Sequence, residues 1–148
     1  MSTYMFVAGK RSGGHNLASS PREHAEELLN ASQWGVNSDR TPNGMLPKPG
    51  DKVVIYAAGE GFIASATVDR TPRRNRSKRF IERGLTHGIR LRSIRRFRQS
   101  VKVGPNLQDR IMEAGEPSIR SLAAFVRQGV RPITFKAGQV IRQASRGR

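Results

Sequence analysis

The sequence predicts a single domain of the α+β class, with an antiparallel hairpin at its centre and short helices on either side. Three observations predict this class. The chain has 148 residues, the length of one ordinary domain. Residues 50–72 alternate as paired strands do, and signals for helix starts stand at Ser20 and Thr134, near the two ends of the chain.

The first strand of the central hairpin follows Gly50. Val53 and Ile55 alternate with Val54 and Tyr56, and such β-branched and aromatic residues suit a pleated strand. We therefore expect the first two of these side chains to face one way and the other two to face the opposite way.

The second strand follows a glycine turn at residues 59–61, whose glycines can adopt the positive φ angles of a tight hairpin. Beyond the turn, apolar side chains recur at every second position, as in a strand with one buried face. These residues are Phe62, Ala64, Ala66 and Val68, with Ser65 and Thr67 between them. The alternation predicts that Phe62 shares the face of the two alanines.

Two elements precede the hairpin. Residues 3–8 are a candidate strand in which Tyr4 and Phe6 face one way and Met5 and Val7 the other. Ser20 can then cap a short helix that ends near Ala31, because its hydroxyl can accept a hydrogen bond from the first turn.

The chain ends with a strand and a helix. Residues 130–133 predict an edge strand because a proline there removes a donor from the ladder. Thr134 can cap a final helix over residues 135–143. We expect a single domain over residues 1–144 and a disordered basic tail at residues 145–148.

The segment after the hairpin is basic. Residues 70–78 predict an exposed loop, and residues 87–97 predict a strand in which Ile89 and Leu91 face inward and the intervening arginines face outward. The phase of this strand slips near Ser93, which indicates a β-bulge.

Composition narrows the class of protein. The chain contains no apolar run near the ~20 residues that a membrane span needs, and its N-terminus lacks the pattern of a signal peptide. Cysteine is absent, which removes disulfides, thiolate catalysis and cysteine-bound zinc and fits a reducing compartment. We expect a cytoplasmic protein that does not engage a membrane.

Positive charge is concentrated in one segment. The formal net charge is +16, and residues 70–102 hold thirteen Lys or Arg against one acid, Glu82. The rest of the chain holds fourteen bases and ten acids. A local field of this kind attracts phosphate backbones, and arginine forks onto phosphate oxygens, so the segment predicts nucleic-acid binding. The alternative is a solvated basic loop.

The sequence contains no pattern typical of an enzyme. His15, His24 and His87 lack the spacing of metal ligands, the acids are scattered, and neither a nucleophile elbow nor a phosphate-binding glycine loop is present. We therefore expect no catalytic site, no metal site and no cofactor.

A binding pocket for a single base is easier to assemble. Such a pocket needs flat apolar walls, polar groups for the base edge and positive charge around it. The candidate walls are Phe6, Trp34, Tyr56 and Phe62, and the candidate edge contacts are Asn37, Ser65 and Thr67. The candidate phosphate contacts are Lys10, Arg11, Arg70, Arg73, Arg74, Arg76, Lys78 and Arg79. For each aromatic residue, a place in the core is the alternative.

Several segments together resemble the EVE domain of the PUA-like superfamily. They are YMFV at residues 4–7, WGV at 34–36, KPGDKVVIYAAGEGFIASATVDRTP at 48–72 and FVRQGVRPITFKAGQVIRQ at 125–143. The resemblance spans nearly the whole chain, and its most specific part is GDKVVIY.

The resemblance implies a PUA-like, mostly antiparallel β-barrel with short flanking helices, formed by a single EVE domain over residues 1–144. It also implies binding of nucleic acid that carries a modified base, flipped into a pocket, as in the related YTH readers of methylated adenine. By position, Trp34 and Tyr56 match residues that the family places near its pocket, and Asn37 lies in the loop after that tryptophan.

Three hypotheses follow. The first is a monomeric, non-enzymatic reader of a modified base in DNA or RNA. The second is a hydrolase acting on a modified nucleoside, like amidohydrolases among the related ASCH domains, with Lys10 and Glu60 as its candidate groups. The third is a structural RNA-binding or protein-interaction module without base selectivity.

Overall fold

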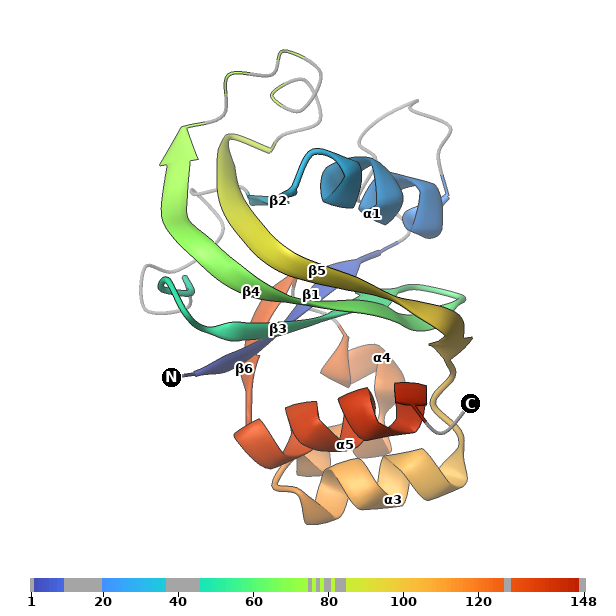
Figure 1. The fold of residues 1–148 in the computed structure, drawn as a ribbon. Helices are drawn as coiled ribbons and strands as arrows, with labels where there is room; N and C mark the ends of the chain where they lie inside the picture. The colour runs from blue at the N-terminus through green and yellow to red at the C-terminus, as the bar shows by residue number, and fades with distance from the viewer. Residues whose placement is uncertain are drawn as a thin grey trace.

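Figure 1 shows the computed structural model, in which one curled sheet separates a single helix from a group of helices. The structure describes residues 2–9, 20–36, 46–74, 76, 78, 81, 85–126 and 129–146. The strands are β1 (Thr3–Ala8), β2 (Gln33–Val36), β3 (Lys52–Ala57), β4 (Gly61–Arg74), β5 (His87–Val101) and β6 (Val130–Ile133). The helices are α1 (Pro21–Asn30), α3 (Pro105–Glu113), α4 (Leu122–Phe125) and α5 (Phe135–Arg146), with a 3₁₀ turn, η2, at Pro117–Arg120.

The sheet has the strand order β2-β5-β4-β3-β1-β6. The β1–β3 pair is parallel and the other neighbours are antiparallel. The predicted α+β class and the predicted edge strand at residues 130–133 are therefore confirmed. Among the described residues, no helix is long and apolar enough to cross a membrane.

Two hydrophobic clusters lie on the opposite faces of the sheet. The α1 cluster, beneath helix α1, contains Phe6 and Ile55, whereas the α5 cluster, beneath helices α3 to α5, contains Met5 and Val54. Successive strand residues enter opposite clusters because side chains alternate across a pleated strand. The alternation predicted for residues 3–8 and 53–56, which lie in β1 and β3, is confirmed.

The second strand of the hairpin departs from the predicted alternation at its first residue. Tyr56 pairs with Phe62 but Ile55 pairs with Ala64, so Ile63 is an extra residue in β4. The bulge turns Phe62 into the α5 cluster, while Ile63 and Ala64 both enter the α1 cluster. The prediction that Phe62 shares the face of the alanines is wrong for this reason.

Strand β5 contains the predicted bulge. Ser93 has a φ of +52°, and the register with β4 shifts between the pairs Thr67–Arg92 and Ser65–Arg95. After the bulge, Phe97 belongs to the α5 cluster.

The predicted loop over residues 70–78 is wrong in its first half. Strand β4 continues to Arg74, which pairs with His87 at the start of β5. Pro72 is a signal for the end of a strand, but a proline is tolerated where one edge of a strand is free. The pairing of β3 with β4 starts at Lys52, which pairs with Thr67, so β3 does not border the last residues of β4.

Helix α5 is longer than predicted. The Thr134 hydroxyl accepts a hydrogen bond from the backbone N–H of Ala137 at 3.1 Å, which confirms the predicted cap. The helix includes Ser145 and Arg146, so a disordered tail beginning at residue 145 is wrong; Ser145 is buried and accepts a hydrogen bond from Arg95 at 2.7 Å. Residues 147–148 lie outside the described part of the chain.

Gly61 should be the most sensitive glycine of the hairpin. Its φ is +112°, and a Cβ there would lie 2.4 Å from the Val101 carbonyl oxygen. Gly59 has a φ of +83°, but a Cβ there would meet nothing within 4 Å. We expect Gly61→Ala to lower the free energy of unfolding by about 3 kcal/mol and Gly59→Ala by about 1–2 kcal/mol, measured by urea denaturation. Equal losses would contradict the close approach of β4 and β5.

Candidate nucleic-acid interface

The four aromatic residues predicted to wall one pocket form two separate pairs. Phe6 stacks on Trp34 in the α1 cluster, with ring centroids 5.6 Å apart and planes inclined by 25°. Tyr56 meets Phe62 edge to face at 5.1 Å in the α5 cluster. Because the sheet separates the clusters, the four rings do not line a common cavity.

All four rings are buried. Trp34 is 2% exposed and Tyr56 6%, while Phe6 and Phe62 are fully buried. The alternative of a place in the core therefore describes each of them in this structure. None offers an open face on which a base could stack.

The predicted edge contacts are also separated. Ser65 alternates with Ala64 and Ala66 of the α1 cluster, so its side chain lies on the other face of the sheet from Trp34. Thr67 lies on the same face as Ser65 and accepts a hydrogen bond from Lys52 Nζ at 3.2 Å. The remaining candidates that lie outside the described residues are Asn37, Lys10, Arg11 and Arg79.

Burial perturbs both tyrosines of the chain. Desolvation raises the pKa of Tyr56 above its ordinary value. Desolvation also raises the pKa of Tyr4, and the nearby carboxylate of Asp51 adds to this effect by disfavouring a second negative charge. The Tyr4 hydroxyl donates a hydrogen bond to the Leu46 carbonyl oxygen at 3.4 Å.

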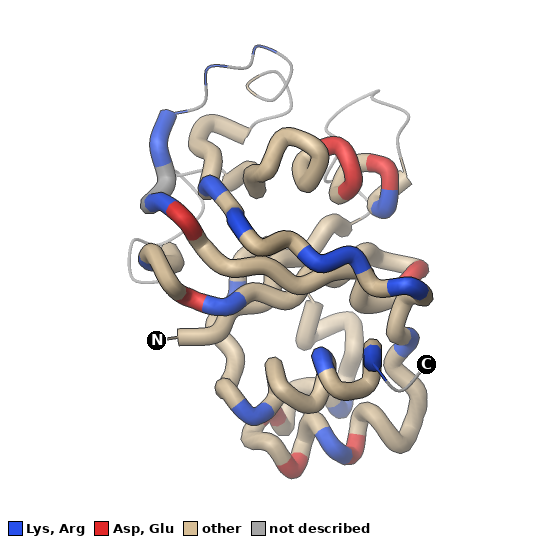
Figure 2. The backbone as a smooth tube through the Cα atoms, in the orientation of Figure 1, with Lys and Arg blue, Asp and Glu red and all other residues tan. Residues whose placement is uncertain are grey.

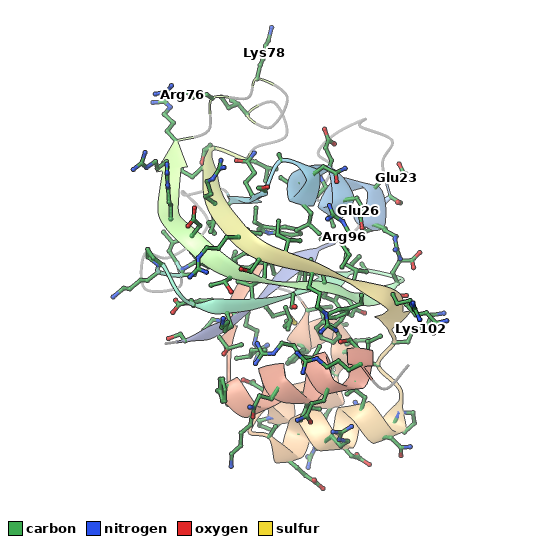
Figure 3. The ribbon with its side chains drawn as sticks, in the orientation of Figure 1. Glu23, Glu26, Arg76, Lys78, Arg96 and Lys102 are labelled. Atoms are coloured by element: carbon green, nitrogen blue, oxygen red, sulfur yellow. The ribbon has the colours of Figure 1, made fainter. Side chains whose placement is uncertain are left out.

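Exposed basic side chains gather at the far end of the β4–β5 pair, which is the end where Arg74 pairs with His87. Arg70, Arg73 and Arg74 lie on the terminal part of β4, where only β5 borders it. Figure 2 shows basic residues along β5 and at this end of β4, and Figure 3 places Arg76 and Lys78 beyond it. The structure thus brings five of the eight predicted phosphate contacts to one end of the molecule.

The adjoining sheet surface, which we call the arginine face, carries further basic residues. Its basic members are Lys52, Arg70, Arg90 and Arg92, and Thr67 and Asp69 lie among them. The Asp69 carboxylate lies 4.0 Å from Arg70 Nε, 3.9 Å from Arg90 Nε and 3.7 Å from Arg92 Nε. The three arginine side chains are more than half exposed.

Arg90 and Arg92 were not among the predicted site residues, although the pattern of residues 87–97 placed them on an outward face. Their signal was present, because two arginines alternate with two buried apolar residues along β5. Lys52 carried no such signal, since only the pairing of β3 with β4 places it beside Thr67.

Other arginines of the basic segment have structural partners. Arg96 donates to Glu26 at 3.1 Å and to Asn30 at 2.7 Å, and so ties β5 to helix α1. Arg95 donates to Ser145 and lies over the Phe97 ring at 5.3 Å. The thirteen basic residues counted in the sequence are therefore not equivalent.

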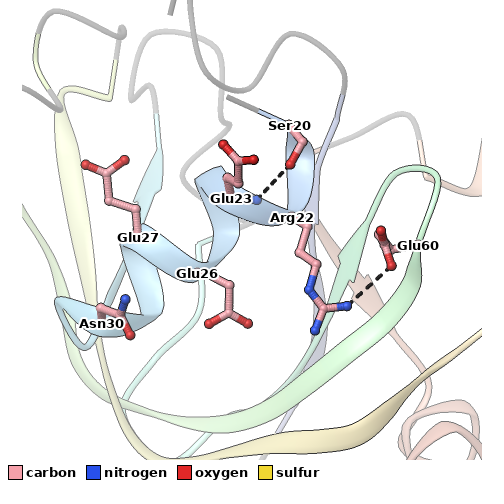
Figure 4. Close-up of a pocket in the computed structure, with 7 residues that line it drawn as sticks. All are labelled: Ser20, Arg22, Glu23, Glu26, Glu27, Asn30 and Glu60. Carbon is pink, nitrogen blue, oxygen red and sulfur yellow. Dashed lines mark hydrogen bonds and ion pairs between the residues drawn. The ribbon is translucent and has the colours of Figure 1, made fainter. Parts of the chain in front are cut away.

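An acidic pocket of about 560 Å³ lies on the α1 side of the molecule (Figure 4). It is lined by Ser20, Arg22, Glu23, Glu26, Glu27, Asn30 and Glu60. Ser20 accepts a hydrogen bond from the Glu23 N–H at 3.1 Å, which confirms the predicted helix cap. Four carboxylates in one pocket disfavour a phosphate ligand there.

The hydrolase hypothesis gains no site from these residues. Glu60 is paired with Arg22 at 3.3 Å on an exposed turn, and Lys10 lies outside the described residues. In the part of the chain that the structure describes, no three His, Asp or Glu side chains are grouped closely enough to hold a metal ion.

Burial of Tyr56 and Tyr4 gives a measurable prediction. The unfolded chain should release both phenolic protons near pH ~10, whereas the folded protein should release them at higher pH. The contribution of these two protonated tyrosines to the free energy of unfolding is therefore fully present below pH ~10. It is lost as the pH rises from there through the raised pKa values. Tyrosinate absorbance of the wild type, Tyr4→Phe and Tyr56→Phe would assign each titration. An ordinary pKa for Tyr56 would mean that its hydroxyl is open to solvent.

Comparison with solved structures identifies the fold. The chain matches a protein from Leishmania major with a TM-score of 0.64 and 17% identity, over 99% of this chain and 96% of that one. It matches a Pseudomonas putida protein with a TM-score of 0.61 and 16% identity, over 97% and 99%. It matches human THYN1, solved in complex with DNA containing 5-methylcytosine, with a TM-score of 0.63 and 13% identity, over 98% of each chain.

No family model matches the chain, and no curated protein matches its sequence. The structural likeness therefore carries the assignment of the fold. The protein has a PUA-like fold, as the resemblance implied, and its sheet forms a curled, mostly antiparallel half-barrel with short helices.

Proposed function

We propose that this protein is a non-enzymatic nucleic-acid-binding domain of the EVE type, which holds phosphates on its arginine face and at the far end of β4–β5. The observation that carries the proposal is the gathering of Arg70, Arg90 and Arg92 on an open sheet surface, with Arg73 and Arg74 beside them. Guanidinium groups bind phosphate oxygens through two parallel N–H donors.

We further propose that the domain prefers a strand with a modified base. Two observations support this: the PUA-like fold is also that of THYN1, whose structure contains 5-methylcytosine DNA, and the sequence segments resemble EVE domains. Trp34, which stacks on Phe6, is the candidate aromatic residue closest in sequence to Asn37, the residue that directly follows β2. A base would reach them only through a rearrangement, because both rings are buried.

A binding module without base selectivity is the second candidate. The burial of all four candidate aromatic rings favours it. The two candidates predict the same dependence on salt, since both use phosphate contacts, and they differ only in the preference for a modified base.

Removing charge from the end of β4 should weaken binding to all sequences alike. We expect the triple variant Arg73→Ser, Arg74→Ser and Arg76→Ser to flatten the plot of log affinity against log salt on duplex DNA by up to about 2.7, or ~0.9 for each lost phosphate contact. Fluorescence anisotropy at several salt concentrations measures this slope.

The matched control for this variant removes three exposed positive charges elsewhere. Arg110→Ser, Arg120→Ser and Lys136→Ser alter α3, η2 and α5 but leave the strands intact. If the control flattens the slope as much as the triple variant does, net charge alone governs binding and the proposed surface is wrong.

Trp34 provides a direct test of base selectivity because it is the only tryptophan. We expect oligonucleotides with 5-methylcytosine to bind at least tenfold more tightly than unmodified ones, or ~1.4 kcal/mol, and to change Trp34 fluorescence more strongly. Truncation to alanine would cost about 3–5 kcal/mol of stability for a buried ring, so Trp34→Phe is the better variant. This variant should keep salt-sensitive binding and lose the preference.

Phe62→Leu is the control for Trp34→Phe, because Phe62 is a fully buried ring in the other cluster. It should retain the preference of the wild type. Equal binding of all modified and unmodified DNA and RNA strands by the wild type would instead favour the module without selectivity.

A further inference from the structure

We infer that Asp69 occupies the position of a backbone phosphate in the free protein, so that Arg70, Arg90 and Arg92 form a phosphate site whose affinity Asp69 lowers. This inference rests on the proposed function, and it assigns one defined subsite and its internal competitor. The ligand class is the phosphodiester of a nucleic-acid backbone.

The distances show that Asp69 does not use the hydrogen-bonding capacity of the three arginines. Its carboxylate lies 3.7–4.0 Å from their Nε atoms, whereas charge-assisted N–H···O bonds are about 2.7–2.9 Å long. The arginine side chains are 54–59% exposed and that of Asp69 is 35% exposed. Their guanidinium forks therefore remain available to a ligand approaching from solvent.

The other acids that pair with arginines are held more firmly. Glu26 accepts from Arg96 at 3.1 Å, and Glu60 from Arg22 at 3.3 Å. Glu116 pairs with Arg131 at 3.5 Å and also accepts the backbone N–H of Thr134 at 2.9 Å. Asp69 lacks such a short contact in the described part of the chain, so its main effect is electrostatic.

The backbone explains why an anion is needed at this point. Arg70 lies directly opposite Arg90, and like charges in that position destabilise a pair of strands. The register shifts between Val68 and Arg70, so Asp69 is an extra residue of β4, and a bulge re-aims the side chains beside it. The bulge brings one carboxylate toward three guanidinium groups that the two strands hold close together.

A phosphodiester is the better partner for these three arginines. It carries one negative charge, as the carboxylate does, and its non-bridging oxygens can accept several N–H donors from outside the sheet. When it binds, Asp69 must share or yield the arginines, and the repulsion between the two anions opposes binding. Asp69 therefore lowers affinity for any phosphate backbone without regard to sequence.

The test compares Asp69→Asn with Asp109→Asn on unmodified duplex and single-stranded oligonucleotides at low and near-physiological salt. Both substitutions remove one negative charge and keep the side-chain shape, and Asp109 is exposed on α3. We expect Asp69→Asn to tighten binding about three- to tenfold at low salt and Asp109→Asn to change it less than twofold. Asp69→Glu, which restores the charge, should bind as the wild type does.

Three results would overturn the inference. An equal gain in both Asn variants would indicate an effect of net charge, and weaker binding by Asp69→Asn would mean that Asp69 organises the arginines. Urea denaturation of each variant checks that the fold is intact. The third result comes from inorganic phosphate, whose binding is followed through the arginine Nε–H signals in NMR. A site that binds free phosphate but no oligonucleotide would exclude the nucleic-acid partner.

The same experiment separates this inference from the proposed function. If the wild type binds oligonucleotides but Asp69→Asn behaves as Asp109→Asn does, only the subsite is wrong. If the wild type binds none of the oligonucleotides at any salt concentration, the proposed function is wrong as well.

Discussion

The pairing of β4 with β5 is the constraint on which the rest of the structure depends. These are the longest strands of the sheet, and each changes face at a bulge. The bulge at Ile63 turns Phe62 toward α5, and the bulge at Ser93 separates the arginines that face solvent from those that brace helices. A slip of one residue would exchange buried and exposed side chains along the whole pair, so the register fixes both the core and the charged surface.

This register also divides the basic residues by their roles. Arg96 and Arg95 join β5 to α1 and α5, and Glu26 balances the charge of Arg96. Arg70, Arg90 and Arg92 share one weakly bound carboxylate and remain exposed. Net charge describes the attraction of the whole molecule for a polyanion, whereas in the proposed function the exposed arginines, and not those that brace helices, fix where a phosphate lies.

The sequence predicted those features that depend on local pattern. The hairpin, the cap at Ser20, the cap at Thr134 and the bulge at Ser93 each follow from a few neighbouring residues. The face of Phe62 and the end of β4 were predicted wrongly, because they depend on how strands distant in sequence pair. The single aromatic pocket had the same weakness: Trp34 and Tyr56 resemble family residues by position, but the sheet lies between them.

Buried aromatic rings and an exposed arginine face together constrain how the protein can bind. Moving a base to Trp34 would require both unstacking the base and opening part of the α1 cluster, and base flipping alone costs a few kcal/mol. Phosphate contacts must then supply most of the affinity, yet contacts that are too strong would hold every sequence equally well. In the proposed function, an acid placed among the exposed arginines would resolve this conflict, because it would lower the affinity that all backbones share and leave a larger share of the total to the base.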